Sequence, residues 1–407
     1  MALMLRPAPA AFALLLSCLP LRPASAQGAA TPLSYAVPAG VHFIASWRET
    51  PERAAIDDLY FRAAKRLWDS GVVWDLLDLA SAHAPSAKRA QIRATVERVL
   101  AALGKVDWAG AFGREGAVAF RFGIPMPEYL FLGRCPEADL ERNLQGIRGL
   151  LGEIASLAPE ELEVREGSGG GSETTSLVVK DSPFGIQLGR GKGTLVLGIG
   201  QTLFASSLHL LGEGNGQGSI GKAAGFEKTL SLLPRERDEE GYFDIAGMCG
   251  VFSSGVSVAG AKAPPKATPI LGALTSLFEE VAALGSVGWA TRGAGSRLVH
   301  DEVILLEPGS SNRFFPRLLG GSRTLEGLDR FLPKDAVVGC ASAGCDPLAA
   351  YDALLETVGG VEGSEKILEA WRGLQARIGF DLRADLLAFL SGEHVSVRLP
   401  SPGAGLF

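Results

Sequence analysis

Two stretches of this chain follow one pattern, and that repeat constrains the fold more than any other feature. The first lies at 37–51 and the second at 332–347. Each opens with an apolar residue and a proline, continues as an apolar run, and ends in Thr50-Pro51 or Asp346-Pro347. A Thr or Asp side chain caps free N–H groups, and proline fits the first helical position. Each copy therefore predicts a strand, a turn and a capped helix.

A second helix is predicted in each copy, ended by Gly104 or Gly379. Its apolar positions recur at helical spacing; they are Ile92, Val96, Val99 and Leu103 in the first copy and Ile367, Trp371, Leu374 and Ile378 in the second. Each copy then reaches a glutamate at the start of a strand, Glu115 or Glu393. We expect the two strands of each copy to pair with each other, because the same pattern of apolar faces demands the same pairing.

The fold class that follows is α+β, with mixed, mainly antiparallel sheets and amphipathic helices packed on them. The expected organisation is a signal peptide at 1–26, an α+β unit at 27–310 and a partial second copy at 311–407. The α+β unit holds the first copy (35–123) and a middle region (124–310) of alternating strands and helices. An incomplete second copy should leave a sheet edge and an apolar face uncovered.

The middle region contains clear periodic segments and three that are ambiguous. Strands are predicted at 128–133, 242–245, 287–291 and 297–306, and helices at 136–157, 202–211, 219–233 and from Thr268-Pro269 to Gly285. The stretch 254–266, rich in Gly, Ala and Pro, predicts a mobile connection. Gly residues at 168–172 indicate a flexible loop, and those at 189–193 a hairpin turn, because the residues around Lys192 do not have Walker spacing.

The first 26 residues have the features of a secretory signal. Arg6 gives a positive start, an apolar run follows, and small residues end at Ala26, before Gln27. The alternative is a lipoprotein signal, since Cys18 follows Leu-Leu-Ser, although Leu16 is larger than such motifs prefer. Export is expected in both cases, to the periplasm or the cell exterior.

Charge and hydropathy exclude some partners. The whole chain has a formal charge of −6, and removal of the signal leaves 37 basic and 45 acidic side chains, a charge of −8. That sign disfavours nucleic acid or an anionic membrane surface as a partner. No transmembrane segment is expected in the mature chain, because its most apolar stretch, 270–284, is interrupted by Glu279-Glu280.

Four cysteines follow the signal, namely Cys135, Cys249, Cys340 and Cys345. An exported chain meets oxidising conditions, so two disulfides are compatible with this number, and burial as small apolar side chains is the alternative. Cys340 and Cys345 are expected to pair with each other if a bond forms, since Gly344 lets the chain turn between them.

The chain resembles a family of secreted bacterial proteins known as domain of unknown function 3352. The resemblance rests on the Leu/Val-Pro strand starts, on Ser391-Gly392-Glu393-His394-Val395, and on Gly241-Tyr242-Phe243-Asp244-Ile245 after 225–230. It spans most of the chain from about Val37. The family has no assigned activity, so the resemblance implies export and no particular chemistry.

Candidate catalytic and metal-binding residues are few. The histidines are His42, His83, His209, His300 and His394, and no two share a helix face at metal-ligand spacing. Ser257 lies in a near match to a nucleophile elbow, and Ser342 in a poorer one. Glu115 and Glu393 are a conceivable carboxylate pair, although duplication alone accounts for both. No catalytic, cofactor-binding or metal-binding residues are assigned, and no cofactor is expected.

The sequence favours an exported, envelope-associated protein that binds or scaffolds a partner. One alternative is a hydrolase whose site is assembled only in three dimensions. Another is a periplasmic carrier of lipid or another apolar ligand, which an apolar content of 47% permits. An envelope protein or an apolar ligand is therefore the expected partner.

Overall fold

The computed structural model describes residues 31–50, 85–319 and 338–398, with isolated positions between 66 and 79. Short gaps fall at 124–125, 183, 201, 262–263, 265–266, 295–296, 343–345, 361–363 and 391–393. The chain divides into two compact units. Unit 1 comprises the described residues up to Phe243 together with Val287–Val303, and unit 2 comprises Asp244–Ser286 together with the described residues from Ile304 onward. Residues 244–286 thus belong with the second copy, although the sequence groups them with the first.

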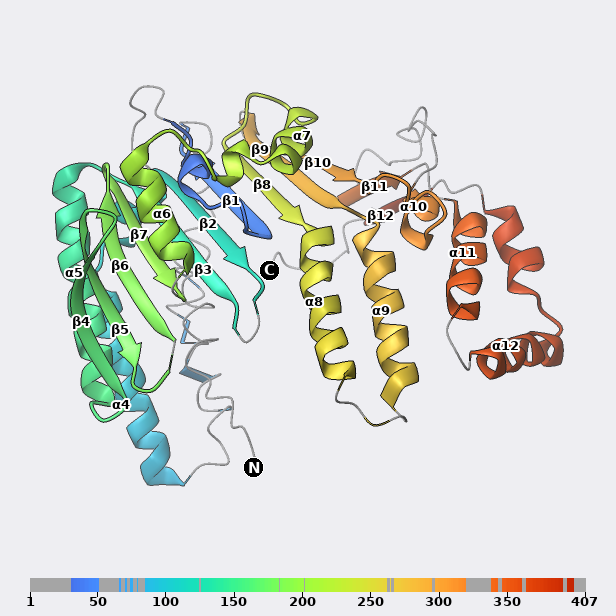
Figure 1. Ribbon diagram of the computed structural model, residues 1–407, viewed down its shortest axis with the longest axis horizontal. Helices are drawn as coiled ribbons and strands as arrows, with labels where there is room; N and C mark the ends of the chain where they lie inside the picture. The colour runs from blue at the N-terminus through green and yellow to red at the C-terminus, as the bar shows by residue number, and fades with distance from the viewer. Residues whose placement is uncertain are drawn as a thin grey trace. The chain divides into compact units, whose positions relative to one another are not determined.

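A ten-stranded sheet forms the centre of unit 1, in the order β10-β9-β8-β1-β2-β3-β7-β6-β5-β4 (Figure 1). The pairings from β8 through β1 to β4 are antiparallel. The strands are β1 (Phe43–Arg48), β2 (Glu115–Arg121), β3 (Glu128–Arg134), β4 (Leu162–Gly169), β5 (Ser172–Val179), β6 (Gly185–Gly191), β7 (Thr194–Ile199), β8 (Glu239–Asp244), β9 (Ser286–Ala294) and β10 (Arg297–Leu305). With the helices below, this arrangement is the expected α+β fold.

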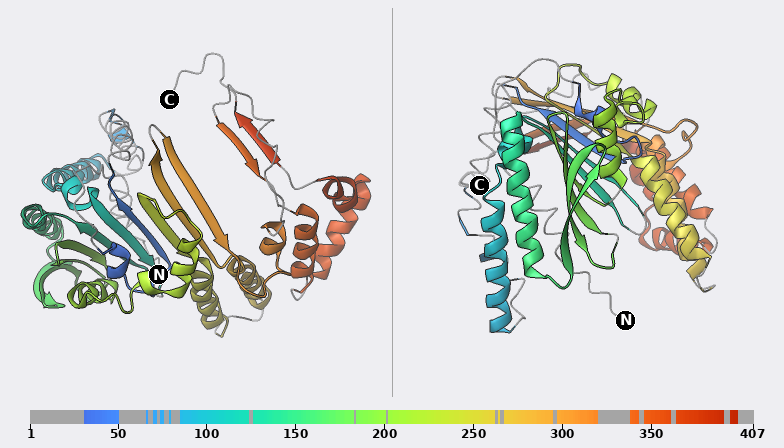
Figure 2. Two further views of the ribbon diagram at one scale, coloured as in Figure 1. Left: turned by 90° about the horizontal axis from the view of Figure 1, so that it is seen from above. Right: turned by 60° about the vertical axis from the view of Figure 1, so that its left-hand side comes forward.

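Helices cover both faces of this sheet. They are η1 (Leu33–Ala36), α4 (Ser86–Leu103), η2 (Ala109–Gly113), α5 (Glu137–Leu157), α6 (Thr202–Glu213), η3 (Ile220–Lys222) and α7 (Ala224–Ser231). On β7, Val196 packs in the core under α6 and α7, whereas Leu195 and Leu197 pack in the core under α5. All six residues of β7 are buried for this reason. α4 runs along α5 (Figure 2).

Unit 2 holds helices and a two-stranded sheet. Its elements are α8 (Ile245–Gly260), α9 (Thr268–Ala282), α10 (Phe314–Leu319), β11 (Val338–Ser342), α11 (Pro347–Gly359), α12 (Glu365–Ile378), η6 (Leu382–Leu386), η7 (Leu387–Phe389) and β12 (His394–Arg398). Asp346 caps α11 as expected, with its Oδ1 accepting from the Ala349 N–H at 2.9 Å. The corresponding start at Thr50-Pro51 is followed by residues outside the described ranges.

The two copies have the same strand pairing. The sequence match sets Phe43 against Val338 and Phe120 against Arg398. In the structure Phe43 pairs with Phe120 in the antiparallel β1–β2 ladder, and Val338 pairs with Arg398 in the antiparallel β11–β12 ladder. The two copies therefore share both strand direction and register, although the sequence match required a three-residue insertion before the second strand.

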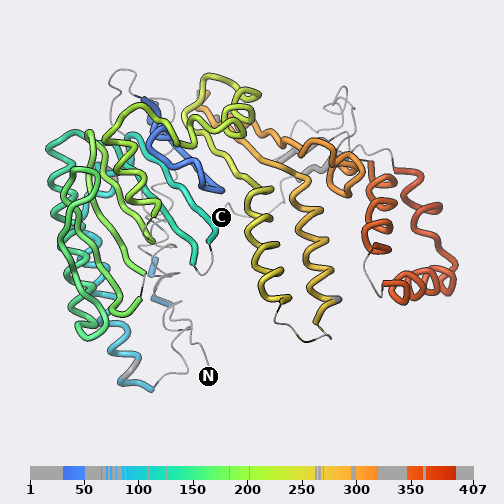
Figure 3. Tube along the Cα trace, in the orientation of Figure 1, coloured from blue at the N-terminus to red at the C-terminus, as the bar shows by residue number. Residues whose placement is uncertain are grey.

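Three local predictions are corrected. The stretch 254–266, expected as a connection, is helical as far as Gly260, because small Gly, Ala and Ser residues let α8 pack closely along α9 (Figure 3). The glycines at 168–172 form a tight β4–β5 turn, with Gly170 and Gly171 at φ 59° and 79°. The helix expected at 219–233 is broken at Ala223, whose φ of −74° and ψ of 129° are extended. The hairpin turn at Lys192-Gly193 is confirmed, with both φ positive.

A buried carboxylate joins the helices of unit 2. Glu280 on α9 accepts from the Arg313 guanidinium at 3.0 Å, from the Phe314 N–H at 2.7 Å and from the Thr357 hydroxyl at 3.0 Å. Arg313 precedes α10, Phe314 is the first residue of α10, and Thr357 lies on α11. The Glu280 side chain therefore links α9 to both of these helices. A buried charge of this kind is tolerated because it is both paired and hydrogen-bonded.

Candidate functional site

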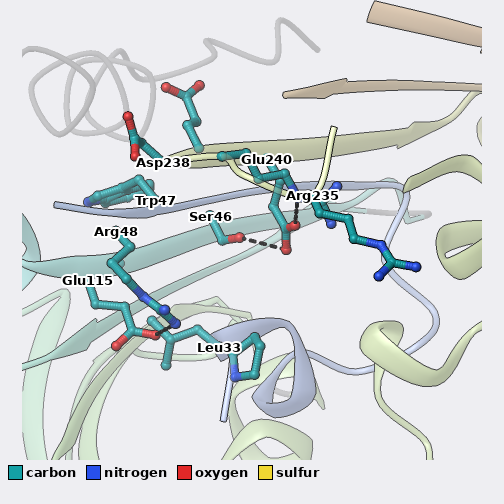
Figure 4. A pocket seen from close by; sticks show the side chains of 12 residues that line it. Leu33, Ser46, Trp47, Arg48, Glu115, Arg235, Asp238 and Glu240 are labelled. Atoms are coloured by element: carbon teal, nitrogen blue, oxygen red, sulfur yellow. Dashed lines mark hydrogen bonds and ion pairs between the residues drawn. The ribbon is translucent and has the colours of Figure 1, made fainter. Parts of the chain in front are cut away.

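A pocket of about 220 Å³ opens in unit 1 beside the C-terminal end of β1 (Figure 4). Because β1 is antiparallel to both β2 and β8, its last residues lie beside the first residues of both strands: Arg48 faces Glu115, and Trp47 faces Glu239. The lining residues are Pro32, Leu33, Ser46, Trp47, Arg48, Glu115, Gly116, Arg235, Arg237, Asp238, Glu239 and Glu240.

Trp47 is held in place by η2 and by the start of β2. Its indole N–H donates to the Phe112 carbonyl at 2.8 Å. A Cβ added to Gly116 would lie 2.3 Å from Cζ2 of the indole, so the ring takes the space that only glycine leaves open. The second copy cannot repeat this arrangement, because the equivalent cross-strand pair is Ser342 with His394.

Glu115 forms ion pairs with two arginines. One carboxylate oxygen lies 2.7 Å from Arg134 and the other 3.6 Å from Arg48. Arg134 also donates to the Thr31 carbonyl at 2.7 Å, which ties the segment before η1 to the sheet. Glu393, its counterpart in the second copy, lies outside the described residues, so the idea of a carboxylate pair stays a prediction.

The remaining acidic groups of the pocket are also engaged. Glu240 accepts from the Arg237 Nε at 2.6 Å and from the Ser46 hydroxyl at 3.4 Å. Asp238 accepts from the Gly293 N–H at 2.6 Å. A hydrolytic nucleophile needs a base that is free to take its proton and a third group to orient that base. Ser46 and Glu240 do not meet this requirement, since the other oxygen of the carboxylate is bound to Arg237.

Arg235 differs from the other arginines of the pocket. Within the described part of the chain it has no ion pair or hydrogen bond, and it is exposed. The pocket therefore offers one accessible guanidinium beside an aromatic ring and a set of paired charges. Such a lining suits a small polar group better than an apolar molecule.

Sequence reasoning missed this pocket. The signal for it is the run 235–240, Arg-Glu-Arg-Asp-Glu-Glu, in which six consecutive residues are charged immediately before the apolar part of β8. A run of charge at a strand start usually faces solvent, so the pattern carries no indication that β1 and β2 deliver further charges to the same place. Only the strand pairing shows that.

The described histidines serve the fold. His42 is buried, and its Nδ1 accepts from the Phe122 N–H at 3.0 Å. His300 on β10 lies 3.0 Å from the Thr291 hydroxyl of β9. His209 is exposed, 3.1 Å from Glu213 one helical turn away. His83 and the side chain of His394 lie outside the described residues. Among the residues that are described, no three metal-ligating side chains come together.

The serine and cysteine candidates are distributed as follows. Ser257 lies inside α8, whereas a nucleophile elbow needs a turn between a strand and a helix. Cys135 and Cys249 are buried and not disulfide-bonded. Burial raises the pKa of the Cys135 thiol to about 11 and also raises that of Cys249, so both behave as apolar side chains. Cys345 and the side chains of Cys340 and Ser342 lie outside the described residues.

A second candidate is an apolar surface on unit 2, which we call the α8–α9 face. Its shared side is formed by Ile270, Leu274 and Leu277 of α9, and Phe252 and Val258 are exposed on α8. Ile270, Leu274 and Leu277 recur at i, i+4 and i+7 and so share one side of α9. Val258 is 68% exposed, Ile270 65% and Leu277 53%. Phe252 stacks on Phe278 with ring centroids 5.6 Å apart, which links α8 to α9.

No helix among the described residues is long and apolar enough to cross a membrane. Comparison with protein-family models gives no match, and comparison with curated proteins gives none either. Among solved structures, the chain is similar to one described as crystal form I of TP0453. The identity is 10%, the TM-score is 0.27, and the match covers 74% of this chain and 90% of that one. A likeness at this level carries no argument about fold or function.

Proposed function

We propose that this chain is an exported binding protein of the cell envelope, belongs to the family of domain of unknown function 3352, and binds its partner through the α8–α9 face. The observation that carries the proposal is this face itself. From Ile245 to Gly260, α8 contains no charged residue, and α9 contains none before Glu279. The signal-like segment at 1–26 supports the export part of the proposal.

Exposure of this apolar surface has a thermodynamic cost that binding would remove. A Leu or Ile side chain gains about 1.5–3 kcal/mol on complete burial, so a half-exposed one retains roughly 1 kcal/mol. Three such side chains on one side of α9 amount to about 3 kcal/mol of unrealised burial. Exposed apolar side chains that share one side of a helix mark interaction sites in soluble proteins.

The pocket of unit 1 supports binding less directly. Its lining is polar and its carboxylates are engaged, so it suits neither a carried apolar ligand nor acid–base chemistry. The α8–α9 face suits an apolar partner, and binding there needs no catalytic group. Binding through that face is therefore the function that the geometry supports best.

Cell fractionation tests the proposal. The full chain, with residues 1–26, is produced in a Gram-negative host and the envelope and soluble periplasmic fractions are compared. The wild type should be found mainly with the envelope. The triple variant Ile270→Ser/Leu274→Ser/Leu277→Ser should move to the soluble periplasm, because serine removes the apolar surface and keeps the helix.

The matched control is Ile367→Ser/Leu374→Ser/Ile378→Ser, which removes three exposed apolar side chains from α12 of the same unit. It should leave the distribution unchanged. Retention of the α9 variant in the envelope would contradict the proposal, as would cytoplasmic accumulation of the wild type with an intact Met1. Mass spectrometry distinguishes cleavage before Gln27 from lipidation of Cys18.

A further inference from the structure

The pocket of unit 1 has a floor of polar side chains that share one face of the sheet. Successive residues of a strand point to opposite faces, so Ser46 and Arg48 of β1 lie on the same face. Ser46 stands opposite Glu240 of β8, and Arg48 stands opposite Glu115 of β2. Figure 4 shows Ser46, Arg48 and Glu115 together on one side of β1. Three neighbouring strands therefore supply the floor of the pocket.

Two segments border this floor. Residues 32–33, at the start of η1, form one border. The other border is the connection from α7 to β8, which Arg237 holds in place by donating to the Leu230 and Pro234 carbonyls at 3.2 and 3.1 Å. Arg235 lies in this connection, so its backbone is fixed while its side chain stays exposed. A cation on a fixed backbone loses less entropy when it binds a ligand.

Three donors of the pocket have capacity to spare. Within the described residues, Arg235 makes no ion pair or hydrogen bond. Arg48 lies 3.6 Å from Glu115, compared with roughly 2.7–2.9 Å for a full charge-assisted hydrogen bond. The Ser46 hydroxyl lies 3.4 Å from Glu240, compared with about 2.7 Å for the usual bond between two oxygens. All three donors can therefore turn to a ligand without breaking a strong bond.

The charges around this floor leave a positive surplus. Glu115 is neutralised by Arg134 at 2.7 Å, and Glu240 is neutralised by Arg237 at 2.6 Å. The other two arginines of the lining have no acidic partner at such a distance. Among the described residues, the four arginines around the floor thus exceed the two glutamates by two positive charges. An anion fits this balance better than a cation does.

The remaining two acids of the lining have other surroundings. Asp238 is 9% exposed and directs one oxygen to the Gly293 N–H at 2.6 Å. Figure 4 shows Asp238 on the other side of β1 from Ser46. Glu239 stands opposite Trp47, so it projects from the face that Ser46 does not share. The sheet thus separates both carboxylates from an anion bound over the floor of the pocket.

We propose that this pocket binds a small dicarboxylate, with one carboxylate on Arg235 and the other on Arg48. Figure 4 shows these two residues on opposite sides of Ser46, so two separated anionic groups fit them better than a single phosphate does. A guanidinium group binds a carboxylate through two parallel hydrogen bonds. The volume of about 220 Å³ is below the roughly 300–1,000 Å³ of pockets for drug-sized ligands and suits a small molecule. The site lies in unit 1 and does not depend on the α8–α9 face.

Equilibrium dialysis of the purified full chain against radiolabelled succinate tests the inference. Succinate should bind at one site per chain, and unlabelled inorganic phosphate or succinamide, the neutral analogue, should compete at least tenfold less well. Arg235→Gln should weaken succinate binding about twentyfold, because a hydrogen bond between charged groups is lost. The matched control is Arg372→Gln, which replaces an exposed arginine of α12 that also lacks an ion pair among the described residues. It should bind succinate as the wild type does.

Two conservative variants separate a role in binding from a role in folding. Arg235→Lys keeps the charge but loses the planar pair of donors, so it should bind succinate about fivefold more weakly than the wild type and more tightly than Arg235→Gln. Ser46→Ala should weaken binding about threefold, because a neutral donor is lost. Circular dichroism and melting temperatures should be those of the wild type in both variants. High salt should weaken binding to the wild type more than to Arg235→Gln.

Three results would overturn the inference. The first is the absence of saturable binding at millimolar succinate. The second is equal affinity of the wild type and Arg235→Gln, with both folded. The third is stronger competition by phosphate than by unlabelled succinate, which would show a site for a single anion. None of these results bears on the proposed function, since Ile270→Ser/Leu274→Ser/Leu277→Ser alters unit 2 and should bind succinate as the wild type does.

Discussion

The two copies of the repeat differ in the strands and helices that pack against them. In the first, the β1–β2 ladder lies between β8 and β3, and α4 packs along α5 with Leu103 in the core. In the second, the β11–β12 ladder forms a sheet of two strands, and α12 has no buried residue within the described part of the chain. Similar sequence and identical register therefore produced different burial, because burial depends on neighbours that lie outside the repeat.

The two copies are also stabilised by different means. Leu103, Trp108 and Phe112 of the first copy pack in a large apolar core. The second copy relies more on polar links, such as the Trp371 indole N–H donating to the Tyr351 hydroxyl at 2.8 Å, and the bidentate contact of Arg383 with Asp352 at 2.8 and 2.9 Å. Substitutions at matched positions should separate these two modes of stabilisation.

The largest effect is expected at the last apolar position of the second helix. Leu103→Ala should lower the free energy of unfolding by about 3 kcal/mol, because it leaves a cavity around a side chain that is 7% exposed. Ile378→Ala, at the matched position, should cost less than about 0.5 kcal/mol, since Ile378 is 60% exposed. Urea unfolding followed by circular dichroism measures both. Equal losses would show that α12 is covered after all.

The next effect concerns the buried carboxylate that fastens α11 of the second copy. Glu280→Ala should cost about 2 kcal/mol, because the Phe314 N–H loses its partner and the Thr357 hydroxyl keeps only its bond to the Ala353 carbonyl. The neighbouring and exposed Glu279→Ala is the control and should cost less than about 0.5 kcal/mol. Thermal unfolding of the two variants provides the comparison. Similar melting temperatures for both variants would contradict the role given to Glu280.

A smaller effect tests a feature common to both copies. Asp107 accepts from the Gly110 N–H at 2.9 Å, and Asp381 accepts from the Arg383 and Ala384 N–H groups at 2.9 and 3.0 Å. Each carboxylate caps the short helical segment before the second strand. Alanine at either position should cost about 1 kcal/mol, and the two losses should agree to within roughly a factor of two. A loss of stability in one copy alone would show that Asp107 and Asp381 do not have equivalent capping roles.

The smallest effect is a pH dependence of the free energy of unfolding, and it arises at β3, the strand beside the first copy. Glu128 begins β3, and burial alone would raise its pKa. Hydrogen bonds from the Leu203 N–H and from Thr202, with the charge of Arg121, outweigh burial and lower that pKa. A lowered folded-state pKa contributes stability above the ordinary value of 4.5, and this stability is lost as the pH falls through the folded value.

Glu128→Gln should therefore cost about 1 kcal/mol at neutral pH and progressively less below pH 4.5. Melting temperatures of wild type and variant, measured from neutral to acid pH, should converge. Glu163, which is exposed and paired with Arg165, provides the control variant Glu163→Gln. A constant difference across the pH range would show that the charge of Glu128 does not hold α6.

Much of the fold could be predicted because its signals are local. The capped start of α11, the helix α5, the β6–β7 turn and the pairing within each copy follow from side-chain caps, helical periodicity, positive φ at glycine and alternation of apolar residues. The errors lie where local and tertiary signals conflict. The stretch 254–260 has the Gly and Ser content of a connection, yet packing along α9 makes it helical.

The candidate sites were less predictable than the fold. Glu115, one of the residues singled out by the repeat, does lie in the pocket, but its partners Arg48 and Arg134 come from neighbouring strands. The sequence predicted α9 as a helix, and helical periodicity could not indicate whether an apolar side of it faces a core or solvent. Periodicity reports which residues share a face and carries no information about what lies opposite.

The sequence by itself indicated the strand pairing within each copy and the capped start of α11. Each depends on residues close together in the chain or on composition alone. The tertiary structure decided which copy is buried by neighbouring elements and which charged side chains meet at the end of β1. It also decided that the α8–α9 face is exposed. These depend on contacts between segments far apart in the chain, which are set by the free energy of packing the whole unit.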